Sequence, residues 1–146
     1  MPRRIMHKPA QSYMLFSTGG RRYAVDVDAV DEIAEMLPEY PIPHAPRFLR
    51  GVVNIHGKLA AVVDLSLYLG GGPEKNGRNL LLLRMAGSAL AIVVEQMERL
   101  LLADEILSIE SAEGDSCGAA LLFADGRADL LALEPLLQSL EKALVA

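Results

Sequence analysis

The amino-acid sequence predicts a mainly β protein built from small barrels. Short, apolar, strand-like runs follow one another through most of the chain, and glycine-containing turns separate several of them. Only a few stretches have the periodicity of an amphipathic helix. Many short strands with few helices favour small β-barrels over a parallel α/β sheet, in which helices would alternate with strands.

Three β-hairpins are predicted where two strand-like runs flank a turn that contains glycine. Glycine adopts the positive φ of tight turns without steric cost. In the first hairpin, Tyr23, Val25 and Val27 alternate with more polar neighbours, as in a strand with one buried face. The hairpins cover residues 13–27, 48–63 and 119–131, further strands are predicted at 80–85, 89–94 and 97–102, and a mobile polar loop is predicted at 110–118.

Residues 28–37 are predicted to form a helix. Val30, Ile33 and Leu37 recur at helical spacing, Asp28 is placed to cap the first turn, and the proline that follows would end the helix. This interpretation makes Val30 a candidate residue of the helix core.

Residues 38–46 contain four prolines and are predicted to form a stiff, extended connector on the surface. Proline lacks the backbone N–H and fixes φ, so this segment cannot join the middle of a sheet. Proline-rich segments also serve as ligands of aromatic grooves, but the ordered elements expected on both sides favour a connector.

Asp64 is predicted to cap a short helix at residues 65–69, and a longer amphipathic helix is predicted at residues 133–145. Residues 62–69 resemble residues 130–137, since both read as the end of a strand that runs directly into a helix. The similarity hints at an internal duplication.

Composition narrows the class of protein. The 146 residues are 51% hydrophobic and 23% charged, with 14 basic and 19 acidic side chains and a net charge of −5. An acidic domain is a poor candidate for binding nucleic acid, which needs a concentrated positive field. The most apolar run, residues 80–94, is interrupted by Arg84 and is too short to span a bilayer. With the single Cys117 no internal disulfide is possible, so we expect a soluble, cytoplasmic protein without membrane insertion.

No pattern in the sequence indicates an enzyme, a metal site or a cofactor. His7, His44 and His56 lack a ligand partner at metal-binding spacing. Cys117 has no neighbouring base that would activate it as a nucleophile, so we interpret it as an incidental thiol. The glycines at 70–72 follow a helix and lack the Lys-Ser or Lys-Thr of a phosphate loop. What remains is a surface that fits an interaction module.

One segment, PHAPRFLRGVVNIHGKLAAVVDL at residues 43–65, resembles the signature of the CheW-like family. It combines a proline turn, a Gly-Val-Val-Asn strand, a basic residue with glycine, and a hydrophobic run that closes in Asp-Leu. Residues 29–33 resemble the Val-x-Glu-Ile segment of the family, and residues 90–95 resemble a strand of its second subdomain. The resemblance extends from about residue 12 to residue 144.

The resemblance implies two packed SH3-like five-stranded β-barrel subdomains with short helices and a C-terminal helix. It also implies a non-catalytic scaffold that couples the cytoplasmic tip of a chemoreceptor to the regulatory domain of a CheA-type histidine kinase, without a cofactor. The expected division is a flexible tail at 1–11 and a single domain at 12–146, with subdomain 1 at 23–78, subdomain 2 at 79–132 completed by the strand at 12–18, and a helix at 133–145.

The resemblance transfers partner-binding roles to eight positions. Receptor or kinase contacts are expected at Val30, Gly51 and His56, kinase contacts at Glu32, Glu39, Tyr40 and Ile42, and a place in the groove between the barrels at Ala91. Each role has a structural alternative: Gly51 also fits a close approach of two strands, and Glu32 a solvated charge. Asp64 is interpreted as a helix cap that contributes about 1 kcal/mol to stability.

The chain departs from the family pattern at four positions. His56 replaces the usual Arg, which is permanently charged and can bind with a bidentate fork, so coupling is predicted to be weaker or pH-dependent. Ala61 stands where Pro is common, Ala132 where a capping Asp is common, and Ala91 where Gly is common, so that its methyl group would narrow the groove. These changes leave two alternatives open: a divergent regulatory or ligand-binding β-barrel, and a receptor-only adaptor in a pilus-type chemosensory system.

Overall fold

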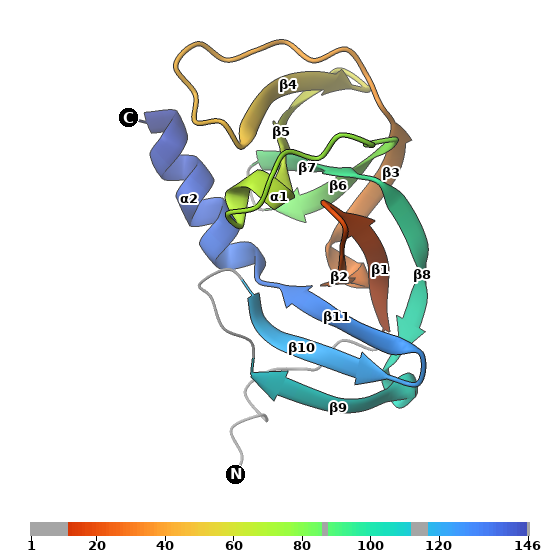
Figure 1. The fold of residues 1–146 in the computed structure, drawn as a ribbon. Coiled ribbons are helices and arrows are strands. Elements are labelled where there is room, and N and C mark those ends of the chain that lie inside the picture. Colours follow the sequence, from red (N-terminus) through yellow and green to blue (C-terminus); the bar gives the residue numbers. More distant parts are fainter. Residues whose placement is uncertain (1–11, 86–87, 112–116, 146) are drawn as a thin grey trace.

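The structure is a computed structural model that describes residues 12–85, 88–111 and 117–145. Within these residues the chain forms strands, two α-helices and two short 3-10 helices, labelled in Figure 1. The elements are β1 (Ser12–Thr18), β2 (Arg21–Asp26), η2 (Val27–Ala29), β3 (Val30–Glu35), β4 (Leu49–Ile55), β5 (Lys58–Val63), α1 (Leu65–Tyr68), β6 (Asn79–Met85), β7 (Ser88–Val94), β8 (Gln96–Leu102), η3 (Ala103–Glu105), β9 (Ile106–Ser111), β10 (Cys117–Phe123), β11 (Gly126–Leu131) and α2 (Leu133–Val145).

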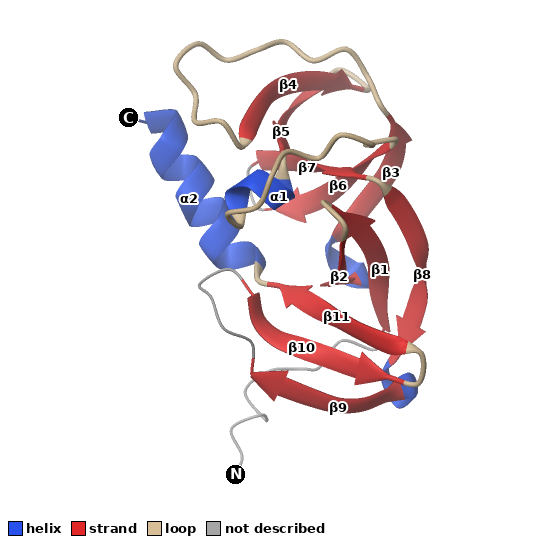
Figure 2. Cartoon of the chain, viewed as in Figure 1, coloured by secondary structure: helices blue, strands red, loops and turns tan. Residues whose placement is uncertain are grey.

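The strands form two sheets, so the mainly β prediction is confirmed (Figure 2). The six-stranded sheet has the order β8-β1-β2-β11-β10-β9, and the five-stranded sheet has the order β3-β6-β7-β5-β4. Each sheet contains one parallel pair, β2 with β11 and β5 with β7, while the other neighbours are antiparallel. The two segments that resemble each other in sequence begin in β5 and β11, and each runs into a helix directly after its parallel-paired strand.

Three clusters of buried side chains hold the sheets together. One cluster lies inside the five-stranded sheet and another inside the six-stranded sheet. The third, here called the central core, lies between the two sheets and also takes in Leu136 and Leu140 of α2. Figure 1 shows α2 running along one side of the molecule beside α1. The helix therefore covers the part of the central core that the sheets leave open.

Strands β6 and β7 are buried on both faces. Along β7, Ile92 faces the central core, while Ala91 and Val93 on either side face the core of the five-stranded sheet. Along β6, Leu81 and Leu80 divide in the same way. A strand with two buried faces needs a continuous apolar run rather than an alternating one, which explains the most hydrophobic part of the sequence.

Strand β1 contributes side chains to two cores and also contains a β-bulge. The pairing of β1 with β8 shifts register between Met14 and Phe16. Leu15 then lies in the core of the six-stranded sheet, and Phe16 lies in the central core beside Tyr23, with ring centroids 5.8 Å apart. The alternation of side chains along the strand therefore aims β1 at both clusters, and the bulge interrupts only its pairing with β8.

The helix predicted at residues 28–37 is wrong. Residues Val27–Ala29 form a single 3-10 turn, in which the Asp28 N–H donates to Oδ1 of Asp26, so that the cap is Asp26 rather than Asp28. Residues Val30–Glu35 form strand β3. Strand β3 pairs with β6, with Glu35 opposite Asn79. The buried backbone of β6 needs a hydrogen-bonding partner on this side, and satisfying it outweighs the local preference for a helix.

The strands are also divided between the subdomains differently from the prediction. Strands β6 and β7, expected in subdomain 2, complete the sheet of β3, β4 and β5, and β2, expected partly in subdomain 1, belongs to the six-stranded sheet. Strand β9 was not predicted, because its residues lie next to a polar segment that reads as a loop. The predicted tail at 1–11 and most of the predicted loop at 110–118 lie outside the described residues.

Two buried carboxylates join the two sheets near the β1–β2 turn. Asp64 caps α1 as predicted, since its Oδ1 accepts a hydrogen bond from the Leu67 N–H at 3.1 Å, and its Oδ2 accepts one from the Glu74 N–H at 2.9 Å. The Glu74 carboxylate in turn accepts hydrogen bonds from the Thr18 hydroxyl at 3.0 Å and from the Gly19 N–H. The segment after α1 is therefore fixed to β1.

Glu74 is a buried residue, with only 7% of its surface exposed. Burial opposes its charged form, but hydrogen bonds from the backbones of Gly19 and Asn76 and from the Thr18 hydroxyl, together with the field of Arg50, outweigh burial, so the pKa of Glu74 lies below its ordinary value. Because the folded state lowers this pKa, ionised Glu74 stabilises the fold above the ordinary glutamate range, and this stability is lost as the pH falls through the lowered value.

We predict that Glu74→Gln lowers the free energy of unfolding at neutral pH by about 1–3 kcal/mol, because one acceptor oxygen becomes an amide that faces an N–H or O–H donor. The variant should also lack the part of the acid destabilisation that Glu74 contributes to the natural protein. Urea denaturation across the acid range measures both effects. Glu35→Gln, at an exposed position of β3, is the matched control, and an equal effect of the two variants would contradict the prediction.

Candidate interaction surface

The predicted partner-binding residues gather on the five-stranded sheet and the connector that crosses it. None of them comes from the six-stranded sheet. Val30 and Glu32 lie on β3, Glu39, Tyr40 and Ile42 on the connector, Gly51 on β4, His56 in the β4–β5 turn, and Ala91 on β7.

His56 and Glu32 contact each other. The Nε2 atom of His56 lies 3.0 Å from Oε2 of Glu32, so the β4–β5 turn reaches over to β3, the opposite edge strand of the same sheet. His56 holds a positive φ of 53°, and the following Gly57 N–H donates to Oδ1 of Asn54 at 2.9 Å. A tight turn with two positive φ angles therefore presents the imidazole, which is 76% exposed, toward Glu32.

Glu39 is engaged within the chain rather than free on the surface. Arg50 Nε donates to Glu39 Oε1 at 3.1 Å, and a second nitrogen of Arg50 lies 3.0 Å from Glu39 Oε2. This two-point ion pair ties the connector to β4. The carboxylate that was expected to face a kinase is therefore partly neutralised by the chain itself.

Tyr40 joins the connector to an edge strand. Its N–H donates to the Val52 carbonyl at 2.8 Å, and the Val52 N–H donates to the Tyr40 carbonyl at 2.9 Å. The prolines leave this one residue able to pair, so the connector covers β4 without forming a full strand. The Tyr40 ring remains exposed, whereas Ile42 is half-buried against the central core.

Gly51 is the point at which the connector and β4 approach most closely. A Cβ atom at this position would lie 2.5 Å from the Tyr40 carbonyl oxygen, and the φ of Gly51 is 155°. Gly51 is itself buried. Gly51 therefore fits the structural alternative given for it, in which glycine allows two backbone segments to approach closely.

Ala91 does not line a groove between the sheets. It is fully buried in the core of the five-stranded sheet, and it is the neighbouring Leu90 and Ile92 that face the central core. The error has a simple cause: β7 is buried on both faces, and the sequence does not reveal which alternate set points to which core. The Ala91 methyl therefore affects internal packing and cannot touch a partner.

Two exposed apolar side chains that were not expected to belong to the site lie close in sequence to Glu32 and His56. Ile33 follows Glu32 on β3, and Leu59 is the second residue of β5, with 65% of its surface exposed. Along β3, Glu32 shares a face with Ala34, which packs against the core of the sheet, whereas Ile33 points to the opposite face. The strand pattern of residues 30–35, once recognised, would have placed Ile33 on the outer face.

A second surface lies where the two sheets meet. Val30, Met14 and Met97 are partly buried against the edge of the central core. Leu100 lies opposite Met14 in the β1–β8 register and is exposed. Val30 therefore belongs to an apolar seam between the sheets rather than to the core of a helix.

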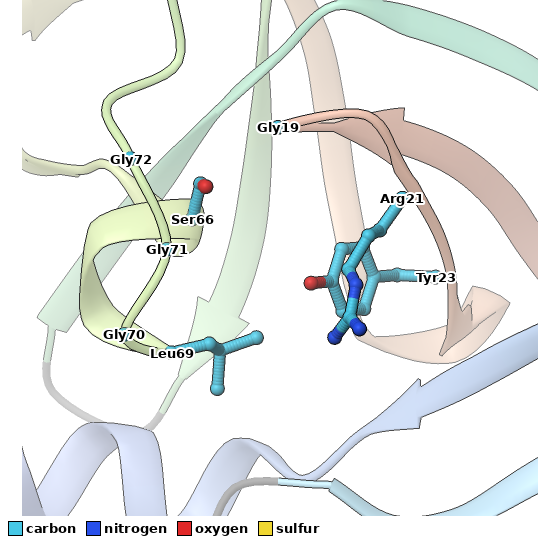
Figure 3. A pocket seen from close by; sticks show the side chains of 8 residues that line it. All are labelled: Gly19, Arg21, Tyr23, Ser66, Leu69, Gly70, Gly71 and Gly72. Atoms are coloured by element: carbon cyan, nitrogen blue, oxygen red, sulfur yellow. The ribbon is translucent and has the colours of Figure 1, made fainter.

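A pocket of about 340 Å³ lies between the β1–β2 turn and the end of α1. Figure 3 shows Arg21 and Tyr23 on one side and Ser66 and Leu69 on the other. The remaining wall is backbone, because it consists of Gly19, Gly70, Gly71 and Gly72. Among the described residues, no group of three or more His, Cys, Asp or Glu side chains is arranged to hold a metal ion. No helix in the described part of the chain is long and apolar enough to cross a membrane.

The fold and its exposed edges define a class of protein: a β-barrel module whose distinctive residues lie on its outer surface. The sequence profile of the CheW-like domain matches residues 12–140, and the chain belongs to this family. The fold is similar to that of the scaffolding protein TtCheW from Thermoanaerobacter tengcongensis, with a TM-score of 0.73 and 22% identity, and the similarity covers 91% of each chain.

Two chemotaxis proteins are also similar in sequence. The chemotaxis protein CheW of Rhizobium meliloti is 40% identical over 55 residues, which cover 38% of this chain and 36% of that protein. The probable chemotaxis protein CheW of Rhizobium etli is 26% identical over 95 residues, which cover 63% of this chain and 61% of that protein. The chain thus aligns with less than two thirds of the length of either relative.

We predict that Gly51→Ala lowers the free energy of unfolding by about 2–3 kcal/mol, because the new methyl group would collide with a backbone carbonyl. Gly57→Ala is the matched control: this glycine also has a positive φ, of 85°, but a Cβ atom there would point into open space. The control should cost about 1 kcal/mol from backbone strain alone. Equal losses in urea denaturation would exclude a special role for the close approach at Gly51.

We predict that the coupling free energy between His56 and Glu32 is below about 1 kcal/mol at about pH 5.5, because the pair is exposed. The coupling should be smaller still at about pH 8.5, because histidine loses its charge as the pH rises. A double-mutant cycle with alanine at both positions, followed by urea denaturation, measures the coupling. Arg84 and Asp31, whose charged atoms lie 3.3 Å apart, form a control pair without histidine. A coupling that changed with pH in both pairs alike would contradict the assignment to His56.

Proposed function

We propose that this protein is a non-catalytic scaffold that couples chemoreceptors to a CheA-type histidine kinase in a chemotaxis-like system. Membership of the CheW-like family supports the scaffold role. The observation that carries the proposal is the contact between His56 and Glu32, which brings two expected partner-binding residues from distant parts of the sequence to one exposed place. In this proposed role the protein works in the cytoplasm beside membrane receptors and needs no cofactor.

The proposed kinase surface is centred on the His56–Glu32 contact. Ile33, next to Glu32 in the sequence, and Leu59, three residues after His56, supply exposed apolar area, and Tyr40 supplies an exposed ring on the connector. Polar and apolar side chains both contribute to protein interfaces. Glu39 and Gly51 support this surface from within, one through its ion pair with Arg50 and the other through close strand approach.

The proposed receptor surface is the apolar seam between the sheets. Val30 and Met14 are partly covered by the central core, and Leu100 is exposed beside them. A helix of the receptor could place an outward-facing apolar side in such a seam. The seam and the kinase surface both involve β3, so both partners would bind near one strand.

The pocket at Gly19 keeps a second function under consideration, a regulatory module that binds a small molecule between its barrels. Its volume of about 340 Å³ is sufficient for a small ligand, and Arg21 stands at its rim. The test is isothermal calorimetry against the extracted small metabolites of the source cells. Saturable binding without binding to a kinase would favour this function over the scaffold.

We predict that the protein binds the isolated regulatory domain of a CheA-type kinase from the same source, and that Glu32→Lys and His56→Ala each weaken binding about 10-fold or more, because both groups lie at the centre of the proposed surface. Isothermal calorimetry measures the affinity. Glu141→Lys makes the same charge change at an exposed position of α2 and should bind like the natural protein. Failure of the folded protein to bind would contradict the kinase role.

The departure at His56 is tested in the same titration. His56→Arg restores a permanent positive charge opposite Glu32, so it should strengthen kinase binding at pH 8, where histidine is mostly neutral. An unchanged affinity would mean that the charge of this residue plays no part in coupling.

A further inference from the structure

We propose that the pocket between the β1–β2 turn and the end of α1 binds a small molecule with one carboxylate group, which Arg21 and Ser66 hold. The inference rests on the second function considered above, the ligand-binding module, for which it supplies a ligand class. It does not depend on the scaffold role, because every predicted partner-binding residue lies outside the lining of this pocket. Ligand binding and kinase binding are therefore separable by mutation.

Arg21 places a positive charge at the rim of the pocket. No other described residue that lines the pocket is charged. Within the described part of the chain, the Arg21 guanidinium takes part in no ion pair and no hydrogen bond, in contrast to that of Arg22, which lies 2.8 Å from Glu98. A guanidinium offers N–H donors in a planar fork that fits the two oxygens of a carboxylate. Arg21 therefore leaves its charge and its donors available to an anion.

Ser66 supplies a second donor from the opposite side of the pocket. It is only 8% exposed, and its hydroxyl makes no hydrogen bond to any other residue that the structure describes. A buried hydroxyl without a hydrogen bond is unfavourable, so most such groups have a partner. Figure 3 shows Ser66 across the pocket from Arg21. A ligand that accepts hydrogen bonds from both side chains explains why neither has a partner within the described chain.

The glycine wall leaves room for a ligand beside these two donors. A Cβ atom at Gly70 or Gly72 would have no heavy atom of the described residues within 4 Å, apart from those of its chain neighbours. Gly70 also has a φ of 91°, which favours glycine over a residue with a side chain. The volume of about 340 Å³ lies at the lower end of the range for ligand pockets, so the ligand is small.

The surroundings of the pocket favour a ligand with one negative charge over a ligand with two. The Glu74 carboxylate accepts a hydrogen bond from the Gly19 N–H, so a negative group already lies behind one wall. Arg21 balances a single charge of the ligand, whereas a dianion such as phosphate would carry a second charge that Glu74 repels. Leu69 and the ring of Tyr23 add apolar surface to the lining. A monocarboxylate with a short apolar or aromatic body fits this combination.

The first experiment is a titration of the full chain with benzoate, followed through its backbone amide signals by NMR, in a buffer free of phosphate and of other carboxylates. The signals of Gly19, Gly70 and Gly72 should move and saturate, with a dissociation constant of about 1 mM. The signals of Gly57 and Gly126, which lie outside the lining, should stay in place. Benzamide has the same shape without the charge and should bind at least about 10-fold more weakly.

The second experiment repeats the titration with variants of the two donors. Arg21→Gln should weaken benzoate binding about 10-fold or more, because a charge-assisted hydrogen bond is lost, and Ser66→Ala about 3-fold, because a neutral one is lost. Arg47→Gln is the matched control, since Arg47 is also exposed and without an ion pair in the described part of the chain but does not line the pocket. Urea denaturation checks that the variants remain folded.

Shifts that rise without saturating, equal binding of benzoate and benzamide, or equal weakening by Arg21→Gln and Arg47→Gln would each overturn the proposal. Inorganic phosphate that binds as tightly as benzoate would overturn the monocarboxylate class. A neutral metabolite that moves the same glycine signals, while benzoate does not, would overturn this inference and leave the ligand-binding function standing. Loss of benzoate binding in Arg21→Gln with kinase binding retained would support the proposal and leave the scaffold role unaffected.

Discussion

The central core that the two sheets share is the constraint on which the rest of the structure depends. It requires β6 and β7 to be apolar on both faces, so that one set of side chains fills the five-stranded sheet and the other set meets the six-stranded sheet. Neither sheet can be solvated on its inner side, because each is one wall of this core. Strand β3 must then pair with β6, and α2 must cover the side that remains open. The buried carboxylates of Asp64 and Glu74 fix the connection between the sheets at the same boundary.

The candidate interaction surface follows from how the five-stranded sheet ends. A sheet has two edges, and here one is covered by the connector at Tyr40 while the other is met by the β4–β5 turn at Glu32. The residues that protect these edges are also the residues expected to bind partners. Edge protection and recognition thus use the same side chains, which explains why several of them are engaged within the chain.

The sequence was informative where one residue determines local geometry. Glycine turns identified the hairpins, and the short helix began at Asp64 because a carboxylate can accept the N–H groups of a first turn. The sequence was less informative where pairing between distant segments decides the secondary structure. Val30, Ile33 and Leu37 fit a helical spacing, yet the need of β6 for a neighbour made this segment a strand.

The candidate site shows the same division. Close approach at Gly51 was one of two roles that glycine itself allows, and the geometry favours it. The contact of His56 with Glu32 joins residues 24 positions apart, and nothing local indicates it. The burial of Ala91 depends on which face of β7 turns to which core, and a run that is apolar throughout does not carry this information. Strand β9 has too many polar neighbours to read as a strand, although it pairs with β10 along most of its length.

The order in which the strands are synthesised means that the two sheets are completed at different times. The five-stranded sheet is made of consecutive segments, from β3 to β7, so it can assemble as the chain leaves the ribosome. Strands β1 and β2 emerge first, but their outer neighbours β8 and β11 are made only after that whole sheet. During this interval the nascent chain exposes the side of β6 and β7 that carries Leu81 and Ile92, which is an apolar surface without its cover. The central core is therefore complete only when α2, which contributes Leu136 and Leu140, has been synthesised.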